Sequence, residues 1–412
     1  LPELTVEENL WYAARLAHGK EDESTTRDRV DRCLHQLGLQ EARHLPVGDA
    51  LNKTISGGQR KRLNIALELI REPMVLLVDE PTSGLSSKDS ELLMDLLKQM
   101  TYAGTLVVAV IHQPSGDIFR SFDALWVLDQ GGYPVFTGRP LDALTHFRTI
   151  VNHFDAEQVA CGQCGHVNPE QIFDIIEVPV LDGRGKPTGQ RRISPKEWND
   201  FLNVLIVPGL ETSPGKEEAP SEWPETGTRR PGWFAQWTIQ AQRDLNRKIK
   251  NRQYLLINLL EAPVLAILLA VLLRSTESGG DYSYGASQNI PHFLFISVIV
   301  AIFMGLTVSA EELFRDRLMR KREANLHLDW GAYLTAKCAV LFGISAIQTL
   351  LFAVCAQFIL DLPGHFFGYT FTLFSVAACA NLFGLIISLL FNSVRVIYLA
   401  IPLFIIPQLM LG

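Results

Sequence analysis

Hydrophobic positions are distributed differently in the two parts of this chain. Residues 1 to about 253 mix apolar and charged positions, whereas residues 254–412 form apolar blocks separated by short polar segments. A helix needs about 20 apolar residues to cross about 30 Å of hydrocarbon. The blocks of that length are 254–273, 291–310, 338–360 and 371–391. A fifth block, 396–411, is interrupted by Pro402 and Pro407 and is expected to be incomplete. The pattern predicts a soluble part followed by an all-α transmembrane part.

The soluble part alternates helix-like and strand-like stretches. Residues 26–38 and 88–100 repeat apolar positions at helical spacing. The stretches "MVLLVD", "TLVVAVI" and "ALWVLD" are short, nearly continuous apolar runs, as expected of strands covered on both faces of a parallel sheet. The stretch "ALWVLDQGGYPVFTG" predicts a hairpin that turns at Gly131 and Gly132. Alternation of this kind favours an α/β architecture.

A polar segment and an amphipathic segment connect the two parts. Residues 207–232 are rich in Pro, Gly and Glu and have few apolar residues to bury, which predicts a flexible linker. Residues 233–253 then place apolar side chains at helical spacing opposite a basic face. These apolar side chains are Phe234, Trp237, Ala241 and Leu245. The segment is expected to lie along the inner membrane surface, and the alternative is an ordinary exposed helix.

Lysine and arginine residues indicate the orientation of the apolar blocks. The approach to the first block, "RDLNRKIKNR", carries five positive charges, and the connection between the second and third blocks carries six. The connection after the first block has only Arg274, and "DLPGHFFGY" after the third has none. The positive-inside rule therefore puts the amino-terminal part in the cytoplasm. The net charge of −7 supplies no dominant basic surface, which argues against a nucleic-acid partner.

The stretch "TISGGQRKRLNIALELI", residues 54–70, has the form of a phosphate-binding helix start. Ser56 and Gln59 have the spacing of a capping box, and the following helix would place Leu63, Leu67 and Ile70 on one face. Gly57 and Gly58 leave the first N–H groups of the helix unobstructed, and such an end binds anions. An isolated motif of this kind is more often an ordinary helix start.

Two further motifs end predicted strands. The stretch "MVLLVDEPTSGLSS" delivers Asp79 and Glu80 at the carboxyl end of a strand, the edge where α/β sheets bind ligands. One carboxylate there suits the Mg²⁺ shell, and the next suits polarisation of an attacking water. "TLVVAVIHQPS" brings His112 to the same kind of edge, where it could reach a terminal phosphate oxygen. A lone histidine would be structural by default, but three such ends together indicate nucleotide hydrolysis.

These motifs resemble those of the ATP-binding cassette (ABC) proteins. "ISGGQRKR" resembles the signature motif, "VLLVDEP" the Walker B strand with its catalytic glutamate, "TSGLSS" the D-loop and "IHQPS" the H-loop. "LTVEENL" at residues 4–10, the order of cassette before spans, and "EELFRDRLMRKRE" after the second apolar block resemble the G subfamily, the white-type half-transporters, and bacterial relatives with an ABC-2 type membrane domain. The resemblance is most specific over residues 54–115.

The resemblance implies roles for these residues. Two subunits of such proteins enclose two ATP molecules head to tail, so Ser56, Gly57, Gly58 and Gln59 would hold the ATP of the partner subunit. Asp79 would complete the Mg²⁺ shell on its own subunit, with Glu80 and His112 catalytic. The Walker A loop and the Q-loop are expected to precede Leu1, so the fragment would be inactive and its parent protein would hydrolyse ATP.

One position departs from the family pattern. The D-loop corresponds here to Ser83, Gly84, Leu85 and Ser86, and the family usually has Asp at the position of Ser86. The D-loop runs between the two nucleotide sites, so the missing carboxylate puts their coupling in doubt rather than hydrolysis itself.

Two other features have open interpretations. Cys161 and Cys164 have the spacing of a metal knuckle, but tetrahedral zinc needs four ligands and no second pair is near. A turn with two ordinary thiols is favoured over a zinc site shared across a dimer. Glu261 lies within the first apolar block beside Pro263. A charge inside a bilayer suggests a functional role, and a position near the inner headgroups is an equal alternative.

The sequence therefore predicts a partial α/β P-loop-type ATP-binding cassette followed by a helical membrane domain. The expected divisions are 1–150 for the cassette, 151–206 for its extension, 207–232 for the linker, 233–253 for the interfacial helix and 254–412 for the spans. The expected protein is a half-transporter in a plasma or bacterial inner membrane, a homodimer or paired with a related half. Its substrate is expected to be hydrophobic or amphipathic, with export the expected direction. The alternative is a membrane-anchored ABC ATPase with a sensing role.

Overall fold

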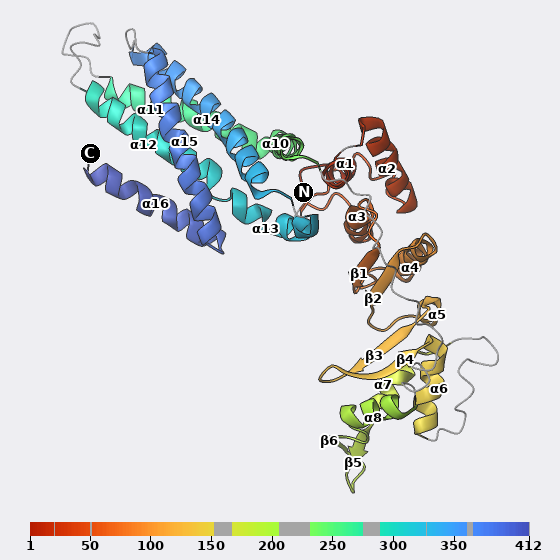
Figure 1. Cartoon of the computed structure of the whole chain (residues 1–412). Helices are drawn as coiled ribbons and strands as arrows, with labels where there is room; N and C mark the ends of the chain where they lie inside the picture. Colours follow the sequence, from red (N-terminus) through yellow and green to blue (C-terminus); the bar gives the residue numbers. More distant parts are fainter. Residues whose placement is uncertain are drawn as a thin grey trace. The chain divides into compact units, whose positions relative to one another are not determined.

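The computed structural model describes most of the chain (Figure 1). The described residues are 1–19, 21–49, 52–151, 167–205, 231–274, 289–326, 328–360 and 366–411. They form two compact units, one of Leu1–Ser56 with Thr228–Gly412 and the other of Gly57–Gly227. Cys161, Cys164 and nearly all of the predicted linker lie outside the described residues.

The amino-terminal helices of the first unit pack against a helix far along the chain. Helix α1 (Val6–Ala17) begins with a capping box, in which the Glu8 N–H donates to the Thr5 hydroxyl at 3.2 Å and the Thr5 N–H donates to the Glu8 carboxylate at 2.9 Å. Helix α2 (Glu23–Gln36) follows. Buried Leu4 and Leu16 share a core with Ile239 of α10 (Trp233–Lys250). This packing places residues 1–56 in the same compact unit as the apolar helices, whereas the sequence assigned them to the cassette.

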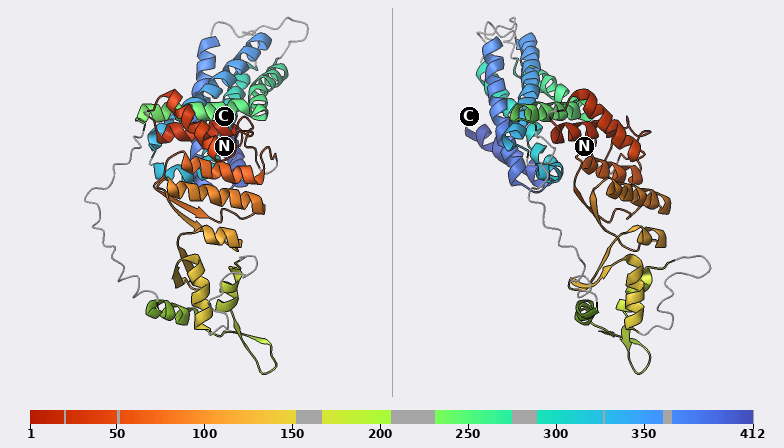
Figure 2. Two further views of the ribbon diagram at one scale, coloured as in Figure 1. Left: turned by 90° about the vertical axis from the view of Figure 1, so that its right-hand side faces the viewer. Right: turned by 45° about the vertical axis from the view of Figure 1, so that its right-hand side comes forward.

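The apolar blocks form the helices of a bundle (Figures 1 and 2). They are α11 (Arg252–Leu273), α12 (Ile290–Ser309), α14 (Trp330–Leu360), α15 (Phe366–Leu390) and α16 (Val394–Leu411), with α13 (Glu312–Glu323) directly after α12. Four helices in the described part of the chain are long and apolar enough to cross a membrane, and these contain the blocks expected to do so, apart from Phe391 at the end of the fourth block. The helix of the fifth block is shorter in its apolar stretch, Val394–Met410.

Small residues bring α12 and α15 close together. A Cβ atom added at Gly305 of α12 would lie 2.5 Å from the Ala377 carbonyl oxygen of α15, and one added at Gly384 would collide with the Ser309 hydroxyl. Membrane helices commonly associate through such positions because small residues let the backbones approach. The bundle core is completed by buried Phe293 and Phe352.

The second unit carries the predicted sheet and its helices. Its elements in order are α3 (Gly57–Leu69), β1 (Val75–Asp79), α4 (Ser87–Tyr102), β2 (Leu106–Val110), α5 (Gly116–Ser121), β3 (Leu125–Asp129), β4 (Tyr133–Gly138), α6 (Pro140–Ile150), α7 (Glu170–Ile176), β5 (Pro179–Leu181), β6 (Pro187–Arg191) and α8 (Pro195–Leu205). Strands β3 and β4 form the predicted hairpin, with Gly131 and Gly132 at φ values of 86° and 79°. Those conformations favour glycine. Rings of Phe147 and Trp198 pack edge to face at 5.2 Å in the core beside this hairpin.

The sheet of β1 and β2 is covered on one face, which corrects the expectation of burial on both faces. Leu76 is 6% exposed, whereas its neighbours Val75 and Leu77 are 52% and 74% exposed. In the described chain this sheet contains only β1 and β2, and the side chains that point away from the helices have no second layer above them. The apolar runs nevertheless predicted both strands correctly, because such a run marks a strand whether one face of the sheet is covered or both.

Candidate functional site

The predicted acidic and imidazole side chains meet at one edge of the sheet. Strands β1 and β2 are parallel, with Asp79 opposite Val110, so their carboxyl ends lie at the same edge. Glu80 directly follows β1, and its carboxylate Oε1 lies 3.8 Å from Nε2 of His112, which follows β2. Both side chains are largely open to solvent, at 46% and 81% exposed. The edge is therefore accessible to a ligand that approaches from outside.

The backbone at this edge is held in an unusual conformation. Glu80 and Gln113 have φ values of 43° and 46°, in the left-handed region that non-glycine residues seldom adopt. The Glu80 N–H donates to the Val110 carbonyl at 2.9 Å, which fixes the first turn after β1 to the end of β2. Residues held in such conformations cluster at functional sites, at a cost of about 1–3 kcal/mol each. One of these residues is Glu80 itself and the other directly follows His112, so the unusual backbone lies at both catalytic candidates.

The signature stretch forms the start of α3 as the sequence predicts. Ser56 and Gly57 are exposed, and a Cβ atom added at Gly57 would meet no atom within 4 Å. Gly58 and Gln59 are partly exposed in the first turn. Leu63 and Ile70 are buried behind this turn, and Leu67 is partly buried. Gly57 therefore leaves the start of this 13-residue helix, its positive end, accessible to a ligand.

Lys61 ties the signature helix to the loop that carries Glu80, a link that the sequence analysis missed. Its ammonium group donates to the carbonyl oxygens of Glu80 at 3.2 Å and Pro81 at 3.4 Å, and also to that of Ser83. A cation near the start of a helix is unfavourable for the helix dipole. That unfavourable position is the signal in the sequence that could have identified Lys61.

Ser86 caps α4 and thereby explains how the D-loop ends without its usual Asp. The Ser86 hydroxyl accepts from the Asp89 N–H at 3.2 Å and donates to the Asp89 carboxylate at 2.8 Å. Arg62 of α3 also donates to Asp89, at 3.1 Å. The hydrogen bond from Ser86, followed by the contact with Arg62, lowers the pKa of Asp89. Gly84, at the centre of the D-loop, has a φ of 71°.

The residues at this edge fit a magnesium nucleotide. Asp79 and Glu80 are exposed carboxylates on an open edge, and carboxylate oxygens are ligands that Mg²⁺ prefers. The α3 start adds the positive end of a helix at an exposed Gly57, which suits a phosphate. This donor set therefore suits phosphoryl chemistry.

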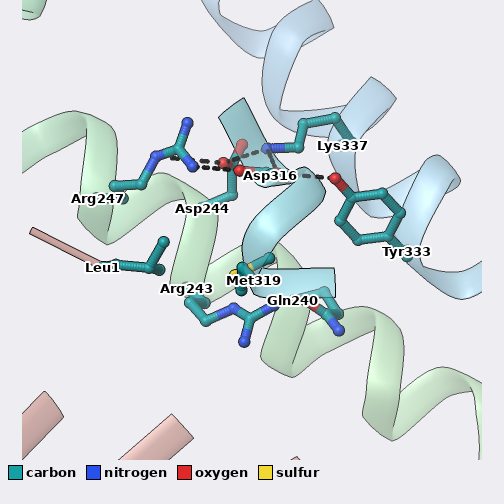
Figure 3. Close-up of a pocket in the computed structure, with 9 residues that line it drawn as sticks. All are labelled: Leu1, Gln240, Arg243, Asp244, Arg247, Asp316, Met319, Tyr333 and Lys337. Atoms are coloured by element: carbon teal, nitrogen blue, oxygen red, sulfur yellow. Dashed lines mark hydrogen bonds and ion pairs between the residues drawn. The ribbon is translucent and has the colours of Figure 1, made fainter. Parts of the chain in front are cut away.

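A buried cluster of charges connects α10, α13 and α14 within the first unit (Figure 3). Arg247 pairs with Asp316 at 2.6 Å and with Glu312 at 3.3 Å. Lys337 pairs with Asp244 at 2.6 Å, with Asp316 at 2.8 Å and with Glu312 at 3.0 Å. We call the six residues of this arrangement the charge cluster: Asp244, Arg247, Lys248, Glu312, Asp316 and Lys337. Lys248 completes it by pairing with Glu312.

The charge cluster is balanced and desolvated. Three carboxylates face three cations, and each of the six side chains is less than 11% exposed. Burial alone would lower the pKa of Lys248, but the Glu312 and Asp244 carboxylates outweigh it and raise that pKa above its ordinary value. Tyr333 adds a hydrogen bond from its hydroxyl to Asp316 at 2.7 Å. The three carboxylates lie close enough together to hold a metal ion, but the three ammonium and guanidinium groups already neutralise them.

The buried basic side chains of α10 correct the expectation for residues 233–253. The predicted amphipathic helix is present, but its basic face points into the protein, where Arg247 and Lys248 are 8% and 4% exposed. Phe234 and Leu245 on the apolar face are 69% and 45% exposed instead. The basic residues are buried because their acidic partners lie about 70 positions later in the chain, which periodicity within one segment cannot reveal. One indication of this buried cluster was present in the sequence, because Lys337 is a cation within an apolar helix.

Glu261 lies partly exposed on α11 and is followed directly by buried Ala262. Among the described residues, no ion pair joins Glu261 to another side chain. Its two interpretations, functional or near the inner headgroups, therefore stay predictions.

Known proteins match both parts of the chain. A family profile described as "ABC transporter" matches residues 1–83, which contain the signature stretch and the acidic pair, and one described as "ABC-2 type transporter" matches residues 235–412. Together they cover more than half of the chain. The chain belongs to the ABC transporters. The predicted fold class, a cassette followed by helical spans, is confirmed with it.

Curated relatives share the same order of domains. "ABC transporter G family member 28" of Arabidopsis thaliana is 36% identical over 195 residues, covering 47% of this chain and 16% of that protein. "Protein white" of Drosophila melanogaster is 26% identical over 393 residues, covering 93% of this chain and 55% of that protein. "ABC transporter G family member 22" of Arabidopsis thaliana is 28% identical over 420 residues, covering 96% of this chain and 55% of that protein. The chain thus spans about half the length, or less, of these relatives.

Among solved structures, part of the chain is similar to a dimeric ATP-binding cassette in a post-hydrolysis state bound to ADP and Pi. The sequence identity is 30% over 32% of this chain and 55% of that chain, and the TM-score is 0.28.

Proposed function

We propose that the full-length protein is half of an ATP-driven transporter of the G type. The observation that carries this proposal is the shared sheet edge, where Glu80 lies 3.8 Å from His112. Membership of the ABC transporters supports it, as do the four apolar helices that follow. ATP hydrolysis would take place where two cassettes meet, and a second half-transporter, identical or related, would supply the other cassette.

Each residue at the edge has a proposed role. Glu80 accepts the proton of the attacking water, because its carboxylate is exposed and free to approach a ligand at the edge. His112 donates to a terminal phosphate oxygen, and Asp79 holds the Mg²⁺ shell. Magnesium-bound ATP supplies the phosphoryl group and the charge that these side chains stabilise. On the partner's ATP, Ser56, Gly57, Gly58 and Gln59 bind the γ-phosphate through the start of α3.

Contacts of Lys61 and Ser86 hold the predicted D-loop in position. Lys61 holds the carbonyl groups of Glu80 and Ser83, so the signature helix and the catalytic loop of one subunit move together. Ser86 begins α4 through Asp89 rather than through a carboxylate of its own. We propose that Ser83, Gly84, Leu85 and Ser86 contact the other cassette and that Lys61 contributes to the coupling that an Asp at position 86 would otherwise support.

The connection between α12 and α14 is the proposed route from cassette to spans. It contains α13, whose Glu312 and Asp316 belong to the charge cluster with α10 and α14. A buried, ion-paired junction transmits displacement because packed elements resist deformation. The proposed substrate is hydrophobic or amphipathic and the proposed direction is export. The basic segments beside the spans support a cytoplasmic cassette by the positive-inside rule.

The Glu80→Gln variant tests this function. In vesicles containing the full-length dimer with Mg²⁺ and ATP, the variant is expected to lose ATP hydrolysis by at least about a hundredfold, because a general base contributes about 10²–10⁴-fold. ATP binding should persist, since the amide keeps the size of the side chain. Glu91→Gln, an exposed carboxylate on α4, is the matched control and should hydrolyse ATP normally.

Flux measurements in the same vesicles separate transport from sensing. ATP-dependent movement of an amphipathic dye that stops in Glu80→Gln supports the transporter. Hydrolysis without movement of any of a panel of amphipathic compounds would favour a membrane-anchored ATPase with a sensing role. Full activity of Glu80→Gln would contradict the catalytic assignment itself.

A further inference from the structure

A cavity in the first unit lies beside α13. It has a volume of about 530 Å³ and is lined by side chains of α10, α13, α14 and α15. Its basic lining consists of Arg317, Arg320 and Lys321 of α13, and its aromatic lining is Trp330 and Tyr333 at the start of α14. The proposed transport cycle gives these side chains no ligand to bind.

The cavity lies where the ends of several spans converge. Trp330 begins α14, Leu389 is in the last turn of α15, and α13 directly follows the end of α12. Successive spans alternate in direction, so these ends belong to the same side of the bundle as the basic segment before α11. This is the boundary between hydrocarbon and headgroups, and an exposed tryptophan such as Trp330, 51% exposed, is typical of that boundary.

Two cations in the cavity have no acidic partner. Among the described residues, neither Arg320 nor Lys321 has a carboxylate within ion-pair distance. Arg320 instead stacks its guanidinium on Trp330, with 2.9 Å between the guanidinium carbon and the ring centroid, and lies 4.5 Å from the Tyr333 ring centroid. The aromatic contacts hold the guanidinium in place without neutralising it.

The remaining charged groups of the cavity are already engaged. Arg317 donates to carbonyl oxygens at the end of α15, to that of Leu389 at 2.7 Å and to that of Phe391 at 3.0 Å. Glu323 pairs with Arg243, and Asp329 accepts from the Ala332 N–H at 2.8 Å at the start of α14. Neither acid pairs with Arg320 or Lys321, and the three cations that line the cavity outnumber its two carboxylates, so the net charge of the lining is positive.

We propose that this cavity binds the phosphate-bearing headgroup of an anionic phospholipid. Arg320 and Lys321 would bind the phosphate, Arg317 would hold the end of α15 against the headgroup, and Trp330 would lie at the level of the glycerol. Basic pockets between spans on the cytoplasmic side are suited to such headgroups. The assignment to the cytoplasmic leaflet rests on the proposed orientation of the transporter, whereas headgroup binding does not.

The test measures lipid binding to the full-length protein in detergent without ATP. A fluorescent short-chain phosphatidylglycerol is titrated, with phosphatidylcholine of the same chain length as the zwitterionic comparison. Phosphatidylglycerol is expected to bind at least about tenfold more tightly. The Arg320→Gln/Lys321→Gln variant is expected to lose about thirtyfold in affinity for it, since each basic residue near a membrane surface contributes about 1 kcal/mol and about 1.4 kcal/mol is tenfold.

Matched controls separate this site from general attraction. Arg315→Gln/Arg322→Gln removes two charges from the same helix at positions that do not line the cavity, and it should keep its affinity within about twofold. Equal losses in both double variants would overturn the proposal. Displacement of the lipid by about 10 mM inorganic phosphate would also overturn it, because the site would then be for a free anion.

A single charge reversal keeps the test informative if the double variant fails to fold. Lys321 is exposed, so Lys321→Glu should fold normally and still weaken phosphatidylglycerol binding by about tenfold. Unchanged binding in a folded Lys321→Glu variant would contradict the proposal. The outcome is independent of ATP hydrolysis, so a failure here and a failure of the transport function can be told apart.

Discussion

A lysine in the first turns of a helix opposes the helix dipole, and Lys61 offsets this by donating to three carbonyl oxygens of the next loop. The three acceptors belong to Glu80, Pro81 and Ser83, so one ammonium group contacts both the proposed catalytic glutamate and the predicted D-loop. Through this side chain, the helix start that would bind the partner's nucleotide is linked to the carboxylate that would act on the subunit's own nucleotide.

The Lys61→Met variant is expected to lower kcat for ATP hydrolysis about tenfold while KM for ATP changes less than about twofold. Each lost hydrogen bond of this type contributes about 1 kcal/mol, and about 1.4 kcal/mol in the barrier is tenfold in rate. Steady-state kinetics of the full-length protein measures both constants. Lys88→Met, an exposed lysine on α4, is the control. An unchanged kcat would mean that the loop keeps its position without Lys61.

At the scale of elements, α4 depends on a capping arrangement that involves a titrating group. The Asp89 carboxylate is tied to Ser86 in its own helix and to Arg62 of α3. These contacts lower the pKa of Asp89 below its ordinary value of 3.8. The stabilisation is therefore present above that ordinary value and is lost as pH falls through the lowered pKa.

The Asp89→Asn variant should consequently melt at a lower temperature than the parent protein at pH 7, with the difference shrinking below about pH 4. Thermal unfolding followed at both pH values measures this. Asp95→Asn, on an exposed position of α4, should show no such dependence. A difference that is the same at both pH values would rule out the charged form of Asp89 as its source.

The elements show what the sequence could and could not predict. The strands β1 and β2, the β3–β4 hairpin and the apolar helices were predicted because apolar runs, glycine turns and block length are local properties. The meeting of Glu80 and His112 followed from strand direction, since parallel strands end at one edge. The uncovered face of the sheet and the buried basic face of α10 were not predictable, because both depend on neighbours distant in the sequence.

At the scale of the molecule, the charge cluster joins three helices of the first unit, α10, α13 and α14. Lys337 contacts all three carboxylates of the cluster. Removing one partner from a buried, paired set leaves an uncompensated charge and costs about 3–5 kcal/mol. Lys337 is therefore expected to matter more for stability than any exposed cation of the same unit.

The Lys337→Met variant should lose folded protein, seen as a large drop in melting temperature of the purified full-length protein. Adding Asp244→Asn should restore part of the loss, because two carboxylates then face two cations. Arg252→Met, at an exposed position at the start of α11, should melt like the parent protein. A double variant no more stable than Lys337→Met would show that charge balance is not what holds the junction.

The left-handed backbone at Glu80 decides which loss-of-function allele is informative. A β-branched replacement such as valine would remove the carboxylate and also disfavour the conformation that hydrogen-bonds the end of β2, so an inactive protein would not reveal which change was responsible. A glycine would relax the turn and free the loop. Glutamine alters the acid alone, and genetic screens of this position can be interpreted only when those two kinds of damage are kept apart.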